Sequence, residues 1–495
     1  MQYLSTRDEK LRKSAAEAIV MGLSRDGGLY TPVSFPRLPD GAVESLAKLP
    51  YAQRAAKIMK LFLDEFSEEE LLGFTEKGYA CPEKFDDAAV APVVTLGENT
   101  HMLELWHGPT CAFKDMALQM LPYLLTASLK KTGETRTVCI LVATSGDTGK
   151  AALEGFRDVA GTKILVFYPK DGVSDIQKLQ MVTQEGENVG VCSVIGNFDD
   201  AQTGVKRIFS DEALRAELDS RGYFLSSANS INWGRILPQV VYYISAYCDL
   251  VAAGKLQNGD KLNFCVPTGN FGNILAGFFA KLMGLPVGRL ICASNENNVL
   301  TDFISTGVYD RNRPFYATSS PSMDILISSN LERLLYLLSG SDEEVRGYMD
   351  SLNETGRYEV SPELREKIGQ TFSCGWCDDE RVGRTIADEF ARSGYLMDTH
   401  TAVAYSVLAD YREKTGDETP AVVVSTASPF KFCSSVLGAL GETELAPGTQ
   451  ILTQLADKTG KPVPAPLGAL AGKSVRFDGA AEKSAMESVV REFLK

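Results

Sequence analysis

Apolar residues recur every three or four positions through much of the first 90 residues, which is the spacing of an amphipathic helix. Residues 13–23 and 52–66 follow this pattern, and Ser67 opens a Ser-Glu-Glu-Glu run with the spacing of a capping box at a further helix. The Gly- and Pro-rich segment 25–36 predicts a loop. Together these patterns predict an N-terminal helical domain over residues 1–92.

From about residue 95 the pattern changes to short runs of β-branched and other apolar residues that alternate with helical periods. Six such runs read as strands: residues 137–143, 163–169, 188–195, 261–267, 289–294 and 421–426. Repetition of strand, Gly-rich loop and helix predicts the α/β class with a parallel sheet. We expect an α/β core over residues 93–310.

The remaining third of the chain is more charged. Residues 311–395 carry helical periods with many charged positions, which predicts a helical insertion. Since the last strand candidate comes only near residue 421, we expect residues 396–495 to return to the core and form the C-terminal region.

Composition excludes several classes of function. The formal net charge is −14, so a nucleic-acid surface, which needs concentrated Lys and Arg, is not expected. The apolar segment 236–254 contains Gln239 and Asp249 and predicts a buried helix instead of a membrane span. The N-terminus has charges where a signal peptide is apolar. We expect a soluble cytoplasmic protein without a membrane partner.

The ten cysteines are scattered, mostly in apolar runs, which is typical of buried free thiols in a reducing compartment. Cys374 and Cys377 have the spacing of a redox or metal motif. Zinc would need two further ligands, and the segment before the pair, residues 362–372, looks helical where a thioredoxin-like site needs a strand. We interpret the pair as incidental and expect no metal.

Two Gly-rich loops lie between a predicted strand and a predicted helix. In residues 268–273 the glycines let the backbone approach a ligand, and the free N–H groups of the next helix favour an anion such as a phosphate. Residues 144–149 could hold a second anion, for example a carboxylate. Neither loop is a Walker or dinucleotide motif. A tight turn or a capped helix without a ligand would give the same patterns.

Lys114 lies in the apolar stretch HGPTCAFKDMALQML, residues 107–121. A buried lysine tends to lose its proton, and a neutral amine forms a Schiff base with an aldehyde. The alternative is an ammonium that reaches solvent or pairs with Asp115. A phosphate-binding loop, a carboxylate-type loop and a desolvated lysine together are what pyridoxal 5'-phosphate requires.

Three motifs together resemble the threonine synthase family in its longer bacterial and fungal form: HGPTCAFKD at 107–115, TSGDTG at 144–149 and PTGNFGN at 267–273. The resemblance extends from SRDGGLYTP near the start to STASPFKF near the end. It implies a fold type II pyridoxal-phosphate enzyme, similar to tryptophan synthase β, with two open parallel-sheet subdomains.

The resemblance also implies roles for residues around the cofactor. Lys114 would be the Schiff-base lysine and the acid–base catalyst, and Thr426 would bond the pyridine nitrogen. Asp147 stands where relatives carry an Asn beside the phenolic oxygen, and a carboxylate there donates a hydrogen bond only when protonated. The cofactor phosphate would be bound by Gly269, Asn270, Phe271, Gly272 and Asn273.

Further residues would hold the substrate. Ser230, Asn232 and Arg235 match the family segment that grips the substrate phosphate, although an ordinary capped helix start would have the same sequence. The substrate carboxylate and phosphate would be received by Thr144, Ser145 and Thr148.

The chain departs from the family pattern at three positions. Ser428 and Phe430 replace the His and Ala of STAHPAKF, and Thr399 stands in DTHT where DPHTA is usual. These departures concern details of the pocket more than the reaction.

The implied reaction converts O-phospho-L-homoserine and water into L-threonine and phosphate by γ-elimination and β-addition. A related phospho-lyase that releases 2-oxobutyrate would share every motif, and another fold type II lyase or a non-catalytic binding protein are further alternatives. We expect a small-molecule substrate, no nucleic-acid partner, and a monomer or homodimer.

Overall fold

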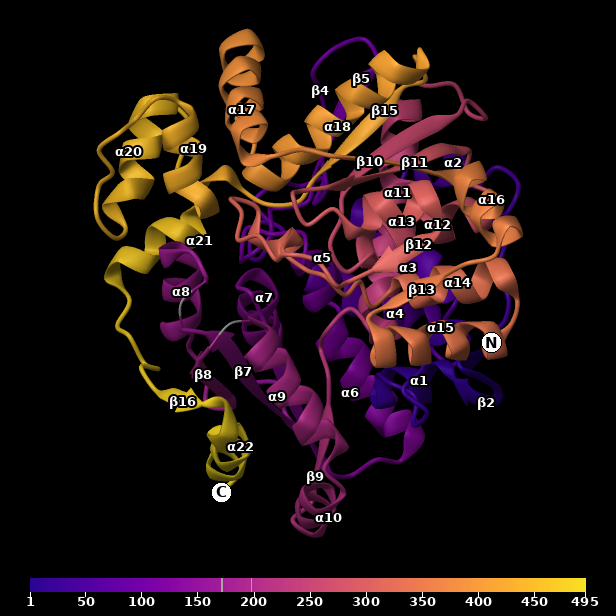
Figure 1. Cartoon of the computed structure of the whole chain (residues 1–495), viewed down its shortest axis with the longest axis vertical. Helices are drawn as coiled ribbons and strands as arrows, with labels where there is room; N and C mark the ends of the chain where they lie inside the picture. Colours follow the sequence, from indigo (N-terminus) through magenta and orange to yellow (C-terminus); the bar gives the residue numbers. More distant parts are fainter. Residues whose placement is uncertain (171, 197) are drawn as a thin grey trace.

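The computed structural model describes residues 1–170, 172–196 and 198–495. Its largest sheet has six strands in the order β14-β11-β10-β15-β5-β4, all parallel except β4. The bounds are β14 Phe372–Trp376, β11 Val287–Ser294, β10 Leu262–Pro267, β15 Ala421–Ser425, β5 Thr100–Glu104 and β4 Val93–Thr95. In Figure 1 this sheet lies in the upper half of the molecule.

Helices cover both faces of the six-stranded sheet. Along β10, Phe264 and Val266 enter a core shared with α11 and α12, whereas Cys265 faces the opposite core shared with α18. This alternation explains why the strand reads as an unbroken apolar run, since both of its faces are buried. The helices around this sheet are α5 Asp115–Leu118, α6 Leu121–Thr132, α11 Trp233–Ala252, α12 Gly272–Leu282, α13 Val299–Thr306 and α18 Thr399–Thr415.

A second sheet of five parallel strands, in the order β16-β8-β7-β6-β9, lies in the lower half of Figure 1. Its strands are β16 Ala480–Glu482, β8 Val189–Ile195, β7 Thr162–Pro169, β6 Thr137–Ala143 and β9 Tyr223–Ser226. Its helices are α7 Asp147–Phe156, α8 Asp175–Val182, α9 Phe198–Ser210, α10 Glu212–Ser220 and α22 Met486–Phe493. The two mainly parallel sheets agree with the α/β class that the pattern predicts and with the two open subdomains that the family resemblance implies.

The N-terminal segment is not only helical. Besides α1 to α4 it contains a three-stranded antiparallel sheet in the order β2-β1-β3, which the periodicity did not predict. The strands are short, one is made largely of charged residues, and β3 lies inside the predicted loop. The bounds are β1 Gln2–Ser5, β2 Asp8–Ser14, β3 Tyr30–Pro32, α1 Ala15–Met21, α2 Ala42–Leu46, α3 Tyr51–Lys60 and α4 Glu68–Gly78. The predicted capping box at Ser67 is present.

The segment 311–395 is also more than a helical layer. Its four helices are joined by β13, which pairs with β12, and by β14, which forms the edge of the six-stranded sheet. The half-buried sequence FSCGW of β14 lacks the apolar run that marks the inner strands. The bounds are β12 Val308–Asp310, η1 Pro321–Met323, α14 Leu331–Ser339, α15 Asp342–Thr355, β13 Arg357–Glu359, α16 Pro362–Thr371 and α17 Asp379–Ser393. The division of the chain at residues 92, 310 and 395 stays a prediction.

After β15 the chain passes through a helical group and then returns to the smaller sheet as β16 and α22, which Figure 1 shows at the lower left. That group comprises η2 Pro429–Phe432, α19 Cys433–Ala439, α20 Gln450–Thr459, α21 Ala465–Gly468 and η3 Ala469–Gly472, with η4 Lys483–Ala485 before α22. In the described part of the chain no helix is long and apolar enough to cross a membrane. The apolar segment from residue 236 lies in α11, which is almost wholly buried as predicted.

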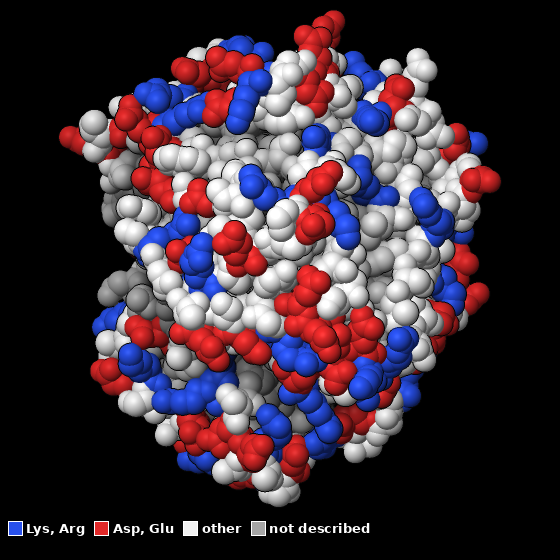
Figure 2. All heavy atoms as spheres, turned by 45° about the vertical axis from the view of Figure 1, so that its right-hand side comes forward, with Lys and Arg blue, Asp and Glu red and all other residues white. Residues whose placement is uncertain are grey.

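The surface carries both signs of charge. On the face in Figure 2, Lys and Arg side chains are interspersed with Asp and Glu. All ten cysteines are free, as expected, and most of them are buried. The Cys374 Sγ lies 3.2 Å from Ser305 Oγ, whereas the Cys377 thiol bonds the Asp378 carbonyl, so the two thiols have separate partners.

Candidate active site

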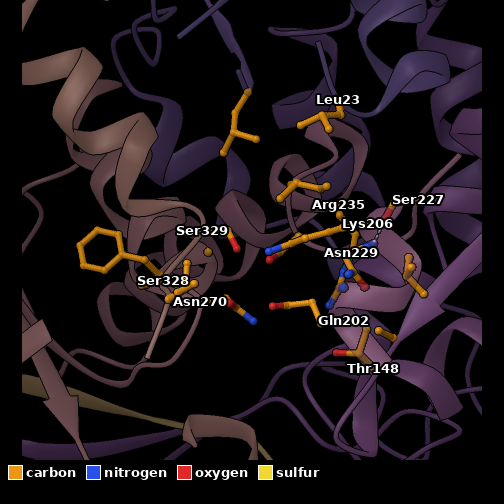
Figure 3. A pocket seen from close by; sticks show the side chains of 18 of the residues that line it. Leu23, Thr148, Gln202, Lys206, Ser227, Asn229, Arg235, Asn270, Ser328 and Ser329 are labelled. Atoms are coloured by element: carbon orange, nitrogen blue, oxygen red, sulfur yellow. Dashed lines mark hydrogen bonds between the residues drawn. The ribbon is translucent and has the colours of Figure 1, made fainter. Parts of the chain in front are cut away.

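Both parallel sheets contribute to one cavity of about 1140 Å³, lined from the loops that follow β6, β10 and β15. These loops leave the carboxyl ends of parallel strands, where α/β folds bind ligands. Figure 3 shows Thr148 and Gln202 on one side of the cavity, with Asn270, Ser328 and Ser329 on the opposite side. All the predicted site residues except Asn232 line this cavity.

Lys114 lies in the wall of the cavity, at the start of the short helix α5, and only 8% of it is exposed. Its Nζ lies 3.4 Å from Asp147 Oδ2 and 3.2 Å from Ser322 Oγ. It does not pair with Asp115, whose carboxylate accepts hydrogen bonds from the backbone N–H and hydroxyl of Thr110. Burial lowers the pKa of Lys114, and although Asp147 opposes this effect, the pKa stays below the ordinary value. The predicted helix after it is divided into α5 and α6.

Asp147 is the only acidic residue that the structure shows within hydrogen-bond distance of Lys114 Nζ among the described residues. Its Oδ1 lies 2.7 Å from the Nζ of Lys431 and accepts a 2.8 Å bond from the Gln177 side chain. Burial alone would raise the pKa of Asp147, but the charges of Lys431 and Lys114 and these hydrogen bonds hold it well below its usual range. Asp147 is therefore a carboxylate and not a hydrogen-bond donor.

Ser322 connects Lys114 to a buried His–Asp pair. The Ser322 backbone N–H donates to His400 Nε2 at 3.2 Å, and His400 Nδ1 lies 2.7 Å from Asp398 Oδ2. Because Nε2 accepts, the proton of a neutral ring is on Nδ1, where the carboxylate holds it. The Thr399 hydroxyl bonds the Ser319 carbonyl, so this departure from the family pattern ties down the same loop.

The loop 268–273 forms a concave backbone at the start of α12. Phe271 has a left-handed φ of 61° and precedes the first turn, so the N–H groups of Gly272 and Asn273 have no acceptor within the helix. The Asn273 Oδ1 accepts from the hydroxyls of Tyr242 and Tyr243, while its buried Nδ2 has no partner. This loop offers several unsatisfied donors to an anion.

The segment 328–330 holds the loop 268–273 in place. Ser328 donates to the Gly269 carbonyl at 2.7 Å, and Asn330 donates to the Asn270 carbonyl from both its backbone and its side chain. A Cβ on Gly269 would lie 2.7 Å from the Ser322 carbonyl oxygen, so a larger residue would push these segments apart.

The loop 144–149 is closed by one of its own side chains. The Thr144 Oγ1 accepts hydrogen bonds from the N–H groups of Gly146 and Gly149 at 3.0 and 2.9 Å. Gly146 has a φ of 136°, and a Cβ there would lie 2.6 Å from the Gln177 side chain. Ser145 and Thr148 line the cavity, so their hydroxyls are placed to meet a ligand.

The segment before α11 supplies a buried cation. Arg235 is 3% exposed and donates to the Ala228 carbonyl, while its Nε has no partner. Burial lowers the pKa of Arg235 to about 10. The Ser230 Oγ accepts from the Asn330 side chain at 2.9 Å. Both residues line the cavity.

Asn232, which the family resemblance places among the substrate-binding residues, lies outside the cavity lining. It caps α11 by accepting from the Gly234 N–H at 2.9 Å, and its Nδ2 donates to the Ile19 carbonyl of α1 at 3.0 Å. The residue is 1% exposed and does not line the cavity. The ordinary reading of the motif, a capped helix start, holds at this position.

The segment 425–432 completes the cavity wall. Thr426 lines the cavity, and its carbonyl accepts from the Phe113 N–H at 2.8 Å, next to Lys114. Ser428 begins the short helix η2, where its hydroxyl accepts from the Phe430 N–H. Phe430 is buried.

Family models match the chain over most of its length. The model described as Pyridoxal-phosphate dependent enzyme matches residues 95–427, Threonine synthase N terminus matches 2–79, and Threonine synthase, C-terminal matches 401–490. The chain belongs to the threonine synthase family. Its fold is the fold type II architecture of pyridoxal-phosphate-dependent enzymes, which confirms the prediction from the three motifs.

Relatives of this family agree in sequence and structure. A threonine synthase from Pseudomonas aeruginosa is 39% identical over 438 residues, 88% of this chain and 90% of the bacterial protein. Threonine synthase-like 1 from Homo sapiens is 42% identical over 444 residues, 88% of this chain but 59% of the human protein, so the chain spans about 59% of that relative.

Solved structures of family members superpose on the whole chain. The structure titled PLP bound Threonine synthase from Brucella melitensis has a TM-score of 0.87 and 36% identity, and it covers 100% of each chain. The threonine synthase from yeast has a TM-score of 0.87 and 34% identity, and it covers 100% of this chain and 98% of the yeast chain.

The sequence did not point to three residues that contact Lys114 or Asp147. Ser322 lies in an irregular loop without a motif, and nothing in the sequence marks it. Lys431 stands inside STASPFKF, where a lysine between two phenylalanines is the same signal of a buried amine that drew attention to Lys114. Gln177 belongs to the capping box of α8, which explains its local sequence but not its bond to Asp147.

Proposed function

We propose that this chain is a threonine synthase, which converts O-phospho-L-homoserine and water into L-threonine and phosphate. The observation that carries the proposal is a buried lysine, Lys114, in the same cavity as the donor-rich loop 268–273. The threonine synthases that match the chain over nearly their whole length support the same reaction.

The residues of the cavity fit pyridoxal phosphate. The unpartnered Nδ2 of Asn273 and the free N–H groups at the start of α12 suit a phosphate, so Gly269, Asn270, Phe271, Gly272 and Asn273 would hold it. Lys114 would bind the aldehyde carbon, and Thr426 would meet the ring nitrogen. When bound, this cofactor supplies a ring that withdraws electrons from the Cα of an amino acid.

The opposite part of the cavity suits the substrate's second anion. Arg235 is buried with an unpartnered Nε, and Ser230 lies on the same segment. We assign these two residues to the substrate phosphate, and Ser145 and Thr148 to its carboxylate. A guanidinium binds phosphate oxygens with a fork of N–H groups, and the partial burial of the site strengthens that attraction. The Thr144 hydroxyl oxygen accepts two backbone N–H groups of its own loop, which leaves its O–H to donate to the substrate carboxylate.

Lys114 is placed to remove and return protons. Its lowered pKa leaves more neutral amine near neutral pH than an exposed lysine has. The Ser322 hydroxyl, 3.2 Å away, accepts from Nζ and can fix the direction of its lone pair when the amine is neutral. His400 holds the backbone of Ser322 in place, so the serine stays within reach.

The test is to incubate the cofactor-loaded chain with O-phospho-L-homoserine and to measure phosphate and amino-acid products together. We expect equal amounts of phosphate and threonine, with both lost in Lys114→Ala. Lys114→Arg is the matched control, because it keeps a cation but cannot form the bond to the aldehyde. Release of 2-oxobutyrate in place of threonine would overturn the proposed reaction in favour of the phospho-lyase.

A further inference from the structure

Lys431 is a fully buried lysine at the junction of three segments that build the cavity. Its Nζ lies 2.7 Å from Asp147 Oδ1 and donates to the Thr110 carbonyl at 2.9 Å. Its own carbonyl accepts from Ser174 Oγ at 3.2 Å, which ties η2 to the start of α8. The side chains of Lys431 and Asp147 are 0% and 2% exposed.

A buried ion pair of this kind is a weak source of stability, because both charges lose their hydration. Apolar side chains of the same volume would fill the space at no greater cost. The pair instead lies directly beside the reacting amine: the second oxygen of Asp147 is 3.4 Å from Lys114 Nζ. One carboxylate is thus shared between two amines.

The two amines do not share it equally. Lys431 has two short contacts, to Asp147 and to a backbone carbonyl, whereas Lys114 has contacts of 3.4 and 3.2 Å. Coulombic attraction falls with distance, so the Asp147 carboxylate interacts more strongly with Lys431 than with Lys114. With Asp147 neutralised by Lys431, little attraction is left to keep a proton on Lys114.

Other charged groups near Asp147 do not change this balance. Gln177, from α8, adds a neutral hydrogen bond that also favours the carboxylate. The charge of Arg235, from α11, also lowers the pKa of Lys114, with a smaller effect than burial, Asp147 or Lys431. The neighbouring Asp115 accepts a hydrogen bond from the Thr110 backbone N–H, and burial raises the pKa of Asp115 to about 6. The Cys111 thiol is buried, and its pKa is raised to about 12.

We propose that Lys431 is a positioning residue for the reaction: it holds Asp147 as a carboxylate and neutralises it, so that Lys114 is free to act as an uncharged amine. This inference rests on the proposed function and on Lys114 as the residue that binds the cofactor. Lys431 does not touch the reacting atoms and acts only through Asp147.

The test measures the protonation of Lys114 directly. The full chain without cofactor is treated with trinitrobenzenesulfonate at a series of pH values, and the labelling rate at Lys114 is read by peptide mass spectrometry. Since only the neutral amine reacts, the rate gives the pH midpoint of Lys114 without any assay of activity. The pH dependence of the visible absorption of the cofactor-loaded chain is the second measurement.

Four variants separate charge from packing. In Lys431→Met, Asp147 pairs with Lys114 alone, so we expect the midpoint to rise by about one pH unit or more, and the labelling rate below the midpoint to fall about tenfold. Lys431→Arg keeps the charge and should leave the midpoint near that of the natural chain. In the double variant Asp147→Asn with Lys431→Met, both charges are gone and the midpoint should return to the lower value. Lys150→Met is the matched control, because it removes a buried lysine that pairs with Glu154.

A midpoint that is unchanged in Lys431→Met, or that stays raised in the double variant, overturns the proposal and reduces Lys431 to a packing role. If Lys431→Met is insoluble, Lys431→Gln removes the charge but keeps a donor for the Thr110 carbonyl, and the same expectations apply. The outcome is independent of the reaction catalysed. A chain that forms 2-oxobutyrate but shows the expected midpoints refutes the proposed function and supports this inference.

Discussion

His107, at the start of the motif that carries Lys114, makes the stability of the fold depend on pH. Its Nδ1 lies 2.6 Å from Asp86 Oδ1, and its Nε2 lies 2.9 Å from Glu104 Oε2. Burial alone would lower the pKa of His107, but the hydrogen bonds and charges of the two carboxylates raise it to about 9. The imidazolium therefore joins the loop before β4 to the end of β5.

The sign and size of the effect follow from linkage. Between the ordinary pKa of 6.5 and about 9, the folded chain keeps a proton at His107 that the unfolded chain has lost. The stabilisation is complete below about pH 6.5 and disappears as the pH rises through about 9. At about 1.4 kcal/mol for each pH unit, the total is on the order of 3 kcal/mol.

The assay compares the natural chain with His107→Gln in urea unfolding at pH 6 and pH 9.5. Buried lysines with lowered pKa values, such as Lys150, give the free energy of unfolding a pH dependence of the opposite sign, so only the difference between the two chains is interpreted. We expect this difference in free energy of unfolding to shrink by about 3 kcal/mol from pH 6 to pH 9.5. A difference that is the same at both pH values would refute the assignment of a charged His107 between two carboxylates.

Three further substitutions test other parts of the structure. Asn232→Ala removes the cap of α11 and its hydrogen bond to α1, so the free energy of unfolding in urea should fall by about 1–3 kcal/mol. A large rise in KM for phosphohomoserine would instead show that Asn232 binds substrate. Ser322→Ala removes the hydroxyl beside Lys114 and should lower kcat roughly 10- to 100-fold with an unchanged melting temperature; equal kcat values would contradict its role. In Gly155→Ala the new Cβ would lie 2.1 Å from a backbone carbonyl oxygen of α5, so we expect the free energy of unfolding to fall by about 1–3 kcal/mol. Gly73 has open space around it, so Gly73→Ala is the control and should leave the melting temperature unchanged or raise it.

The features that the sequence predicts well depend on residues that are consecutive in the chain. The strand TVCILVA coincides with β6, because a strand buried on both faces needs an unbroken apolar run. Lys114 and the loop 268–273 were also found locally, one by its apolar surroundings and the other by its glycines. Their meeting in one cavity followed from the family resemblance and not from either pattern alone.

The features that escaped depend on contacts between distant segments. Ser322 reaches Lys114 across 208 positions of sequence, and no local pattern encodes that contact. β1 and β2 are stabilised by pairing and by the helices packed on them, so their polar sequences do not read as strands. Asn232 shows that a motif shared with a family does not give the contacts of each of its side chains, since the Asn232 side chain bonds α11 and α1 within the fold.

The pairing of β5 with β15 sets a time order for the formation of the site during protein synthesis. Lys114 follows the first of these strands, but Thr426, which lines the same cavity, and Lys431, which pairs with Asp147, are added more than 300 positions later. At roughly 5–20 residues per second, the ribosome needs on the order of a quarter of a minute to a minute to reach them. Throughout that interval Lys114 lacks the segment that completes the cavity and excludes water, and Asp147 lacks its ion pair with Lys431. The nascent chain therefore acquires a reactive amine only after residue 431 has been joined.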